Sequence, residues 1–138
     1  AVWELHGNWE RLVCTRCGTV VELGDAVEVD GDPVPACPSC GGQMRPDIVM
    51  YGESLDQGVI EAAVSAIARA STLIVAGTSL VVYPAAGLIN YFSGDHLALM
   101  NATPTSADAH ADLIVRDTVG ATLDRVMDEL RAEGVVPA

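Results

Sequence analysis

All four cysteines of this 138-residue chain lie in two Cys-x-x-Cys pairs, and this feature constrains the fold more than any other. Cys14 and Cys17 form the first pair, Cys37 and Cys40 form the second, and 19 residues separate the pairs. Two residues between thiolates let one tight turn direct both sulfurs at one point, so two such turns supply a tetrahedral site that suits Zn²⁺. A closed four-thiolate site leaves no position for a substrate. We therefore predict a structural zinc.

Paired cysteines also occur as disulfides or as a redox-active dithiol. A redox site does not need a second pair, and no secretory leader places the chain in an oxidising compartment. Gly18 follows the first pair and Gly41–Gly42 follows the second, where the backbone must bend sharply behind each turn. We expect residues 9–44 to form a zinc-ribbon module whose folding depends on the metal.

The charge and hydropathy of the chain argue against several classes of partner, although acidity taken alone is explained as well by solubility. The formal net charge is −12, which argues against binding to phosphate backbones and fits a neutral or cationic partner. Half of the residues are hydrophobic, but no apolar run reaches the length of a membrane span and no leader is present. The sequence therefore predicts a cytoplasmic protein that contacts neither nucleic acid nor membrane directly.

Strands and helices alternate after the cysteine pairs. Apolar runs at 72–76, 97–100 and 112–115 predict strands, the first of them buried on both faces. Helices are expected from Ser54, with Gln57 as its capping-box partner, from Pro84 to Phe92, and from Thr118 onward. The inner stripe of the last helix would be Val119, Leu123, Val126, Met127 and Leu130. This order predicts an α/β fold, a partial Rossmann-like parallel sheet with helices.

Shorter elements are expected in the first third of the chain. Strands are predicted at 2–5, 20–23 and 26–29, a turn at Asp30–Pro33, and an extended segment over 46–53.

Polar residues follow two of the predicted parallel strands. Gly77-Thr78-Ser79 comes after the first, and Asn101 comes after the second. Ligands of parallel sheets lie beyond the carboxyl ends of the strands, where glycine permits close approach and hydroxyl or amide groups hold phosphate or ribose oxygens. An ordinary turn would explain either feature alone; together they favour a nucleotide site.

These motifs, in this order and over nearly the whole chain, resemble the sirtuin family of NAD-dependent protein lysine deacylases. The resemblance rests on Glu4–Gly7, the two cysteine pairs, Arg45–Glu53, Gly77–Gly87, Asn101, Pro104–Thr105 and Ala111–Asp112.

The resemblance implies a role for each of these segments. His6 would be the general base that activates a ribose hydroxyl of NAD, because imidazole titrates near neutrality. The acyl-lysine protein or peptide would bind between two segments, namely Val49, Met50, Tyr51, Gly52 and Glu53 on one side and Val81, Val82 and Tyr83 on the other. NAD would contact Gly77, Thr78, Ser79, Asn101 and Val119. The zinc held by the four cysteines would be structural.

Several residues depart from the family pattern. Asn8 replaces a serine, Met50 an aromatic residue and Thr103 a glutamate, but none of these changes removes a reacting group. The family's Gly-Ala-Gly-x-Ser loop and Thr-Gln-Asn-Ile-Asp segment do not occur in the chain. We therefore expect a C-terminal portion of a sirtuin that is inactive in isolation. Its expected parts are 1–8 with the histidine, 9–44 with the zinc, and 45–138 as half of the NAD-binding domain.

Two other functions remain open at this point. The same site would support ADP-ribosyl transfer, although the apolar run at 48–51 argues mildly against it. A zinc ribbon on an incomplete sheet would also serve as a binding module without turnover.

Overall fold

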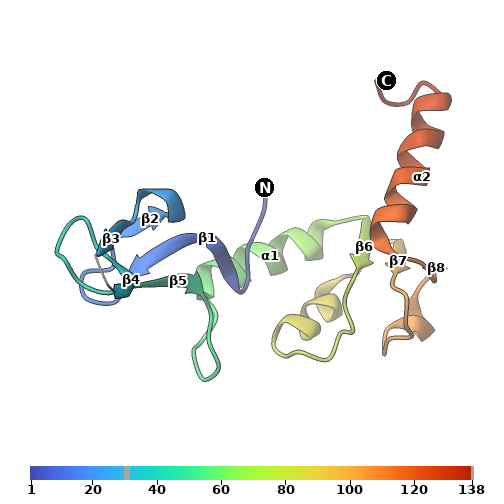
Figure 1. The fold of residues 1–138 in the computed structure, drawn as a ribbon. Helices are drawn as coiled ribbons and strands as arrows, with labels where there is room; N and C mark the ends of the chain where they lie inside the picture. Colours follow the sequence, from blue (N-terminus) through green and yellow to red (C-terminus); the bar gives the residue numbers. More distant parts are fainter. Residues whose placement is uncertain (30–31, 138) are drawn as a thin grey trace. The chain divides into compact units, whose positions relative to one another are not determined.

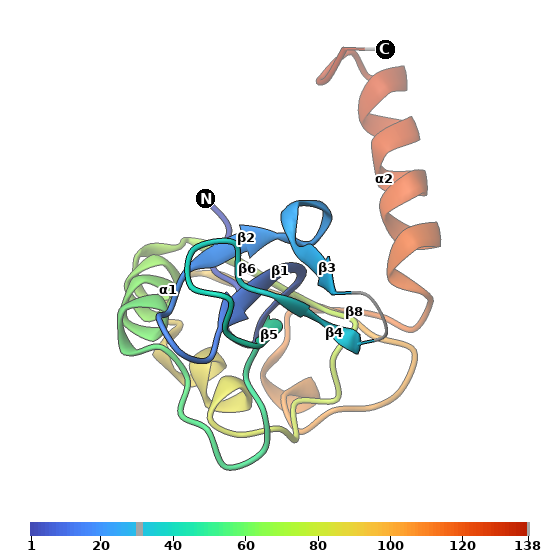
Figure 2. The same cartoon turned by 60° about the vertical axis from the view of Figure 1, so that its left-hand side comes forward.

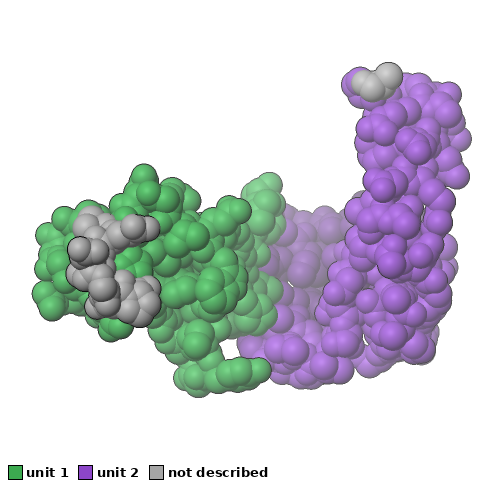
Figure 3. Space-filling model, in the orientation of Figure 1, with its two compact units in different colours: residues 1–60 green, residues 61–138 purple. Residues whose placement is uncertain are grey.

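A computed structural model describes residues 1–29 and 32–137 of the chain (Figure 1). The first elements are the strands β1 (Gly7–Cys14), β2 (Val20–Glu22), β3 (Val27–Val29), β4 (Asp32–Ala36) and β5 (Met44–Ile48), with the 3₁₀ turn η1 (Leu23–Asp25). They are followed by α1 (Gln57–Arg69), β6 (Thr72–Ala76), η2 (Ala85–Tyr91), β7 (His96–Met100), η3 (Asp108–His110), β8 (Leu113–Val115) and α2 (Val119–Ala132). Residues 1–60 and 61–138 form two compact units (Figure 3).

The first unit contains two small antiparallel sheets. β1 is the central strand of the order β2-β1-β5, and β3 pairs with β4 (Figure 2). Two of the cysteines belong to the core of this unit, which consists of Leu12, Cys14, Cys37 and Met44. A core of this size leaves much of the stability of the unit to the cysteine site.

The second unit contains the predicted parallel sheet, with strand order β6-β7-β8. β6 has the predicted bounds, and β7 and β8 each differ from the prediction by one residue at the start. On one face of the sheet, Leu97 and Leu99 pack with Ala107, and Leu73, Val75, Ile89 and Phe92 surround them. The α/β fold class is therefore confirmed.

Three predictions for strands and turns need correction or remain untested. Residues 2–5 do not form a strand, because regular pairing begins only where Gly7 meets Ile48. β6 is covered on one face rather than two, since Ile74 on its other face is 54% exposed. Of the turn predicted at 30–33, Asp30 and Gly31 lie outside the described residues, and Asp32 begins β4.

The helices also differ from the prediction in detail. α1 begins at Gln57 instead of Ser54, because the Asp56 carboxylate accepts a hydrogen bond from the Val59 N–H (2.8 Å) and takes the capping role. The helix predicted after Pro84 is the 3₁₀ helix η2. Thr118 is at the N-cap of α2, but its hydroxyl makes no capping bond. The stripe predicted to face inward on α2 is largely exposed, at Leu123, Val126 and Met127.

Helices long and apolar enough to cross a bilayer do not occur in the described parts of the chain.

Candidate functional site

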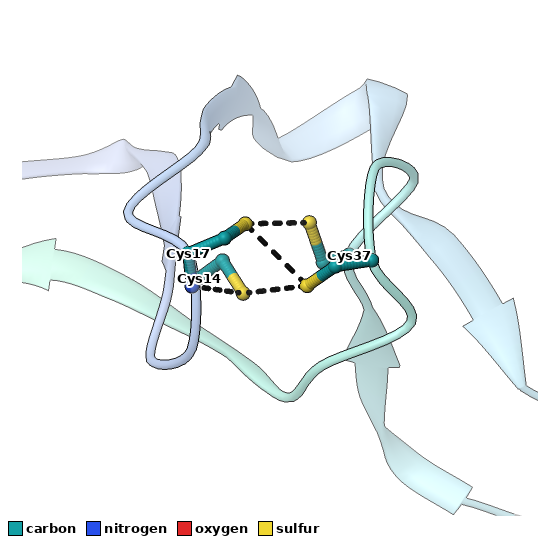
Figure 4. Close-up of side chains that lie close together, drawn as sticks. Cys14, Cys17 and Cys37 are labelled. Carbon is teal, nitrogen blue, oxygen red and sulfur yellow. Dashed lines mark hydrogen bonds between the residues drawn. The ribbon is translucent and has the colours of Figure 1, made fainter.

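The four cysteines of the first unit converge on one point (Figure 4). Their sulfurs all lie within 4.8 Å of one another. The Sγ–Sγ distances are 3.6 Å for Cys14–Cys40, 3.7 Å for Cys17–Cys37 and 3.4 Å for Cys17–Cys40. A tetrahedron with Zn–S bonds of about 2.3 Å has edges of about 3.8 Å, whereas a disulfide bond is about 2.05 Å long. All four thiols are free, so the donor set and its spacing fit zinc and not two cystines.

The two turns that carry these sulfurs have the same backbone construction. The Gly18 N–H donates to the Cys14 carbonyl (3.0 Å), and the Gly41 N–H donates to the Cys37 carbonyl (2.8 Å). Both glycines have a positive φ, 72° at Gly18 and 68° at Gly41, which other residues adopt at a cost. Each turn therefore presents its two sulfurs in the same geometry.

Hydrogen bonds stabilise the thiolate form of Cys17, whereas contacts with the neighbouring sulfurs and burial raise the pKa of Cys40 to about 12. The Thr19 hydroxyl lies 3.1 Å from the Cys17 sulfur, and this contact is the main reason that the pKa of Cys17 falls to about 6. The backbone N–H groups of Arg16 and Cys17 point at the Cys14 sulfur, at 3.3 and 3.5 Å. Metal ligands must be thiolates, so the lowered pKa of Cys17 favours metal binding by this residue at neutral pH.

His6 lies in a fixed turn at the start of β1. The Gly7 N–H donates to the Glu4 carbonyl (3.1 Å) and closes the turn. The Glu4 carboxylate accepts a hydrogen bond from the Asn8 side chain (2.6 Å) and forms an ion pair with Arg11 (2.9 Å). Asn8, which departs from the family pattern, thus helps to hold the turn. The His6 side chain itself is exposed and free to meet a ligand.

The same turn is bonded to the segment predicted to bind the acyl-lysine substrate. The Val49 N–H donates to the His6 carbonyl (3.0 Å), directly after the last β1–β5 pair, Gly7 with Ile48. The extended segment predicted over 46–53 ends there, because Met50–Glu53 forms a turn in which the Glu53 N–H donates to the Met50 carbonyl (3.0 Å). The structure therefore brings the backbone of His6 and the start of the 49–53 loop together.

The residues predicted to bind NAD gather at the carboxyl edge of the parallel sheet. Gly77 and Asn101 follow the register partners Ala76 and Met100, and the Gly77 N–H donates to the Met100 carbonyl (3.0 Å). A Cβ at Gly77 would lie 3.4 Å from a methyl carbon of Val119, so the start of α2 borders the same edge. With a φ of 63°, Gly77 leaves its backbone open to close approach by a ligand.

The other predicted residues of the second unit follow Gly77 in the chain. The Thr78 hydroxyl accepts a hydrogen bond from the Leu80 N–H (3.2 Å), while Ser79 is exposed. The Asn101 side-chain amide donates to the Thr103 carbonyl (2.8 Å), which fixes its orientation. Hydroxyl and amide groups beside a glycine suit the ribose and phosphate oxygens of a dinucleotide. Val81, Val82 and Tyr83 are exposed and do not form a strand.

Sequence reasoning assigned no role to three arginines that support these segments. Arg11 bridges Glu4 and Asp47, and Arg45 binds Glu53. Arg116 donates to the carbonyls of Asn101 and Thr103 (3.3 Å each). The sequence could not single out these three, because six of the seven arginines lie within nine positions of a predicted site residue.

Comparison with known proteins gives consistent results. The model of the Sir2 family matches residues 1–84. A protein from Clostridium perfringens named NAD-dependent protein deacetylase is 50% identical over 128 residues, which is 92% of this chain and 52% of the relative. A protein of the same name from Cutibacterium acnes is 46% identical over 125 residues, covering 91% and 50%.

Solved structures show the same similarity in three dimensions. The structure described as "Sir2-p53 peptide-NAD+" has a TM-score of 0.81 and 39% identity, and covers 97% of this chain and 56% of that one. "Sir2 bound to acetylated peptide" also has a TM-score of 0.81 and 39% identity, with 92% and 55% covered. The chain thus spans about half the length of the relatives that it matches.

Proposed function

Because the chain belongs to the Sir2 family, we propose that it is the C-terminal portion of an NAD-dependent protein lysine deacylase. The observation that carries the proposal is 50% identity with a relative named NAD-dependent protein deacetylase. The reaction transfers the acyl group of a lysine to the ADP-ribose of NAD and releases nicotinamide. The partner is an acyl-lysine protein or peptide, and the cellular compartment is the cytoplasm.

One residue is assigned to proton transfer and two segments are assigned to the peptide. His6 acts as the general base, since an exposed imidazole on a fixed turn can take a proton from a ribose hydroxyl. Val49 and Tyr51, with the exposed Val81–Tyr83 segment, contact the acylated peptide, whose side chain has lost its charge. The pairing of His6 with Val49 supports a common site for base and substrate.

The cofactor and the metal are assigned to other residues. Gly77, Thr78, Ser79, Asn101 and Val119 hold NAD at the edge of the parallel sheet. NAD supplies the ADP-ribose that accepts the acyl group. Zinc at Cys14, Cys17, Cys37 and Cys40 stabilises the first unit, because four thiolates leave no coordination position for a reactant.

Replacing His6 by alanine tests its role as the general base. The test uses the full-length protein of which this chain is proposed to be the C-terminal portion. We expect kcat/KM for an acetylated peptide to fall by a factor of about 10² to 10⁴, the usual contribution of a general base. Release of nicotinamide and of deacetylated peptide is measured by chromatography and mass spectrometry. Zinc content should not change, since the imidazole is not among the four thiolate ligands.

His96→Ala is the matched control, because this exposed histidine at the start of β7 has no assigned role and should keep full activity. Undiminished turnover in His6→Ala would remove His6 from its role. If the wild type transferred ADP-ribose to protein and did not deacylate, this result would favour ADP-ribosyl transfer as the activity of the site.

A further inference from the structure

A two-pronged ion pair closes the loop that follows β5. Arg45 Nη1 lies 2.5 Å from Glu53 Oε1, and Arg45 Nη2 lies 2.8 Å from Glu53 Oε2. Two parallel N–H···O bonds between a guanidinium and a carboxylate fix both distance and orientation. We call this pair, Arg45 with Glu53, the clasp.

Each partner of the clasp also binds the backbone of the loop that it closes. Arg45 Nη2 donates to the Ile48 carbonyl (3.1 Å), and Glu53 Oε2 accepts from the Met50 N–H (2.9 Å). Gly52, with a φ of 85°, makes the reversal, and the Tyr51 side chain is fully exposed at the tip. The clasp therefore holds the loop at three points: its entry, its turn and its exit.

The entry of this loop is also bonded to the turn of His6. The Val49 N–H donates to the His6 carbonyl (3.0 Å), and the clasp contacts the residues on either side, Ile48 and Met50. One backbone hydrogen bond and one ion pair thus hold Val49–Gly52 in place relative to the backbone of His6.

Stability alone does not explain this arrangement. The side chains of Arg45 and Glu53 are about as exposed as those of Arg11 and Asp47, and ion pairs at such positions contribute little to folding. Holding a short exposed loop in one conformation has a different benefit. When the backbone is already ordered, a ligand that pairs with it binds more tightly, because binding does not have to order that backbone.

We propose that Arg45 and Glu53 are positioning residues that preorder the Val49–Gly52 backbone for the acylated peptide and so determine the KM for that substrate. This inference depends on the proposed deacylase function. Neither residue needs to contact the reacting atoms: Arg45 acts through Ile48, and Glu53 acts through Met50.

The test uses Glu53→Gln and Arg45→Lys in the intact protein. Each variant keeps much of the side-chain volume but loses the two-pronged pair. We expect the KM for an acetylated peptide to rise about tenfold. A tenfold loss of affinity corresponds to the free-energy cost of ordering about one backbone residue. The kcat and the KM for NAD should stay within about a factor of two, because the clasp does not touch the groups assigned to them.

Two further measurements separate positioning from a general structural defect. In a double-mutant cycle, the variant with both Arg45→Ala and Glu53→Ala should have a peptide KM no higher than that of either single variant, because the two residues act as a unit. Asp128→Asn removes the Arg131–Asp128 pair on α2, and should leave the peptide KM unchanged. If Glu53→Gln does not fold, Arg45→Lys gives the same readout.

Each outcome is decisive. An active wild type with an unchanged peptide KM in both variants would overturn the role of the clasp and leave the proposed function intact. A wild type that neither binds nor deacylates acetylated peptides would overturn both. A raised peptide KM with a normal KM for NAD would support the proposal.

Discussion

Among the glycines that the structure describes, Gly7 leaves the least room for a side chain. A Cβ at this position would lie 2.0 Å from the Asp47 carbonyl oxygen, and its φ is 78°. This close approach lets β1 meet β5 immediately after His6, so that the imidazole is followed at once by a paired strand. The sequence showed the His-Gly pair, but not the carbonyl that excludes a side chain.

Glu53 gives a residue-scale prediction on pH. The hydrogen bond from Arg45, supported by the Met50 N–H, lowers the pKa of Glu53 from 4.5 to about 2. Because the folded pKa is depressed, the contribution of this carboxylate to stability is present above its unfolded pKa and is lost as the pH falls toward 2. The clasp should therefore stay ionised at pH values where free glutamate is partly protonated.

Carboxyl ¹³C NMR of Glu53 checks this expectation. On lowering the pH toward about 4, near the ordinary pKa of glutamate, the wild-type resonance should stay at its ionised position. In Arg45→Gln it should move toward the protonated position. Identical titration curves in the two proteins would contradict the ion-pair origin of the shift.

At the scale of elements, the two cysteine turns are the best-predicted part of the chain. Their spacing and the glycines behind them follow from local sequence, because each turn is specified within five residues, whereas the strand β4 between them was not predicted. Gly42 adds a tertiary constraint, since a Cβ there would lie 3.1 Å from the Cys14 sulfur and 3.2 Å from that of Cys40.

Removal of zinc should unfold the first unit and leave the second intact. A structural zinc contributes roughly 10 kcal/mol or more, which exceeds what the small core of this unit supplies. The expected result of chelation is rapid trypsin cleavage after Arg16, which lies inside the first turn and donates to the Cys40 carbonyl (3.2 Å). Mass spectrometry of the fragments measures it.

Arg125 on α2 provides the internal control, because it belongs to the other unit and its cleavage rate should not depend on metal. Resistance of Arg16 to trypsin after complete zinc removal would mean that the metal does not hold this fold.

At the scale of the whole molecule, charge and exposed apolar surface are the dominant features. All seven basic residues are arginines, and each contacts an acidic side chain, a carbonyl or a hydroxyl of the chain itself. The remaining charge is acidic, so the surface favours cationic over anionic partners.

The parallel sheet has one uncovered face. Ile74, Ala98 and Leu113 are register partners in one row across β6, β7 and β8, and Ile74 and Leu113 are each 54% exposed. An apolar row of this kind favours association, because its burial removes hydrophobic surface from water. We expect the 138-residue chain by itself to associate with further copies.

The double change Ile74→Thr and Leu113→Thr should weaken this association by about tenfold or more, while threonine keeps the preference for strand. Sedimentation velocity over a range of concentrations measures the effect. Val2→Ser, at an exposed apolar residue of the other unit, serves as the control. A wild-type chain that stays monomeric throughout that range would contradict the expectation.

The sequence by itself determined the elements whose cause is local: the cysteine turns, the strand β6, and the order of strands and helices in the parallel sheet. It also identified the candidate site, since spacing and resemblance gave His6, the 49–53 loop and the residues after β6 and β7. Only the tertiary structure decided which groups meet. The start of β1 at Gly7, the cap at Asp56, the clasp of Arg45 and Glu53, and the open face at Ile74 depend on contacts between distant residues or on side-chain geometry. Hydrophobic periodicity records which residues are apolar, but not what covers them.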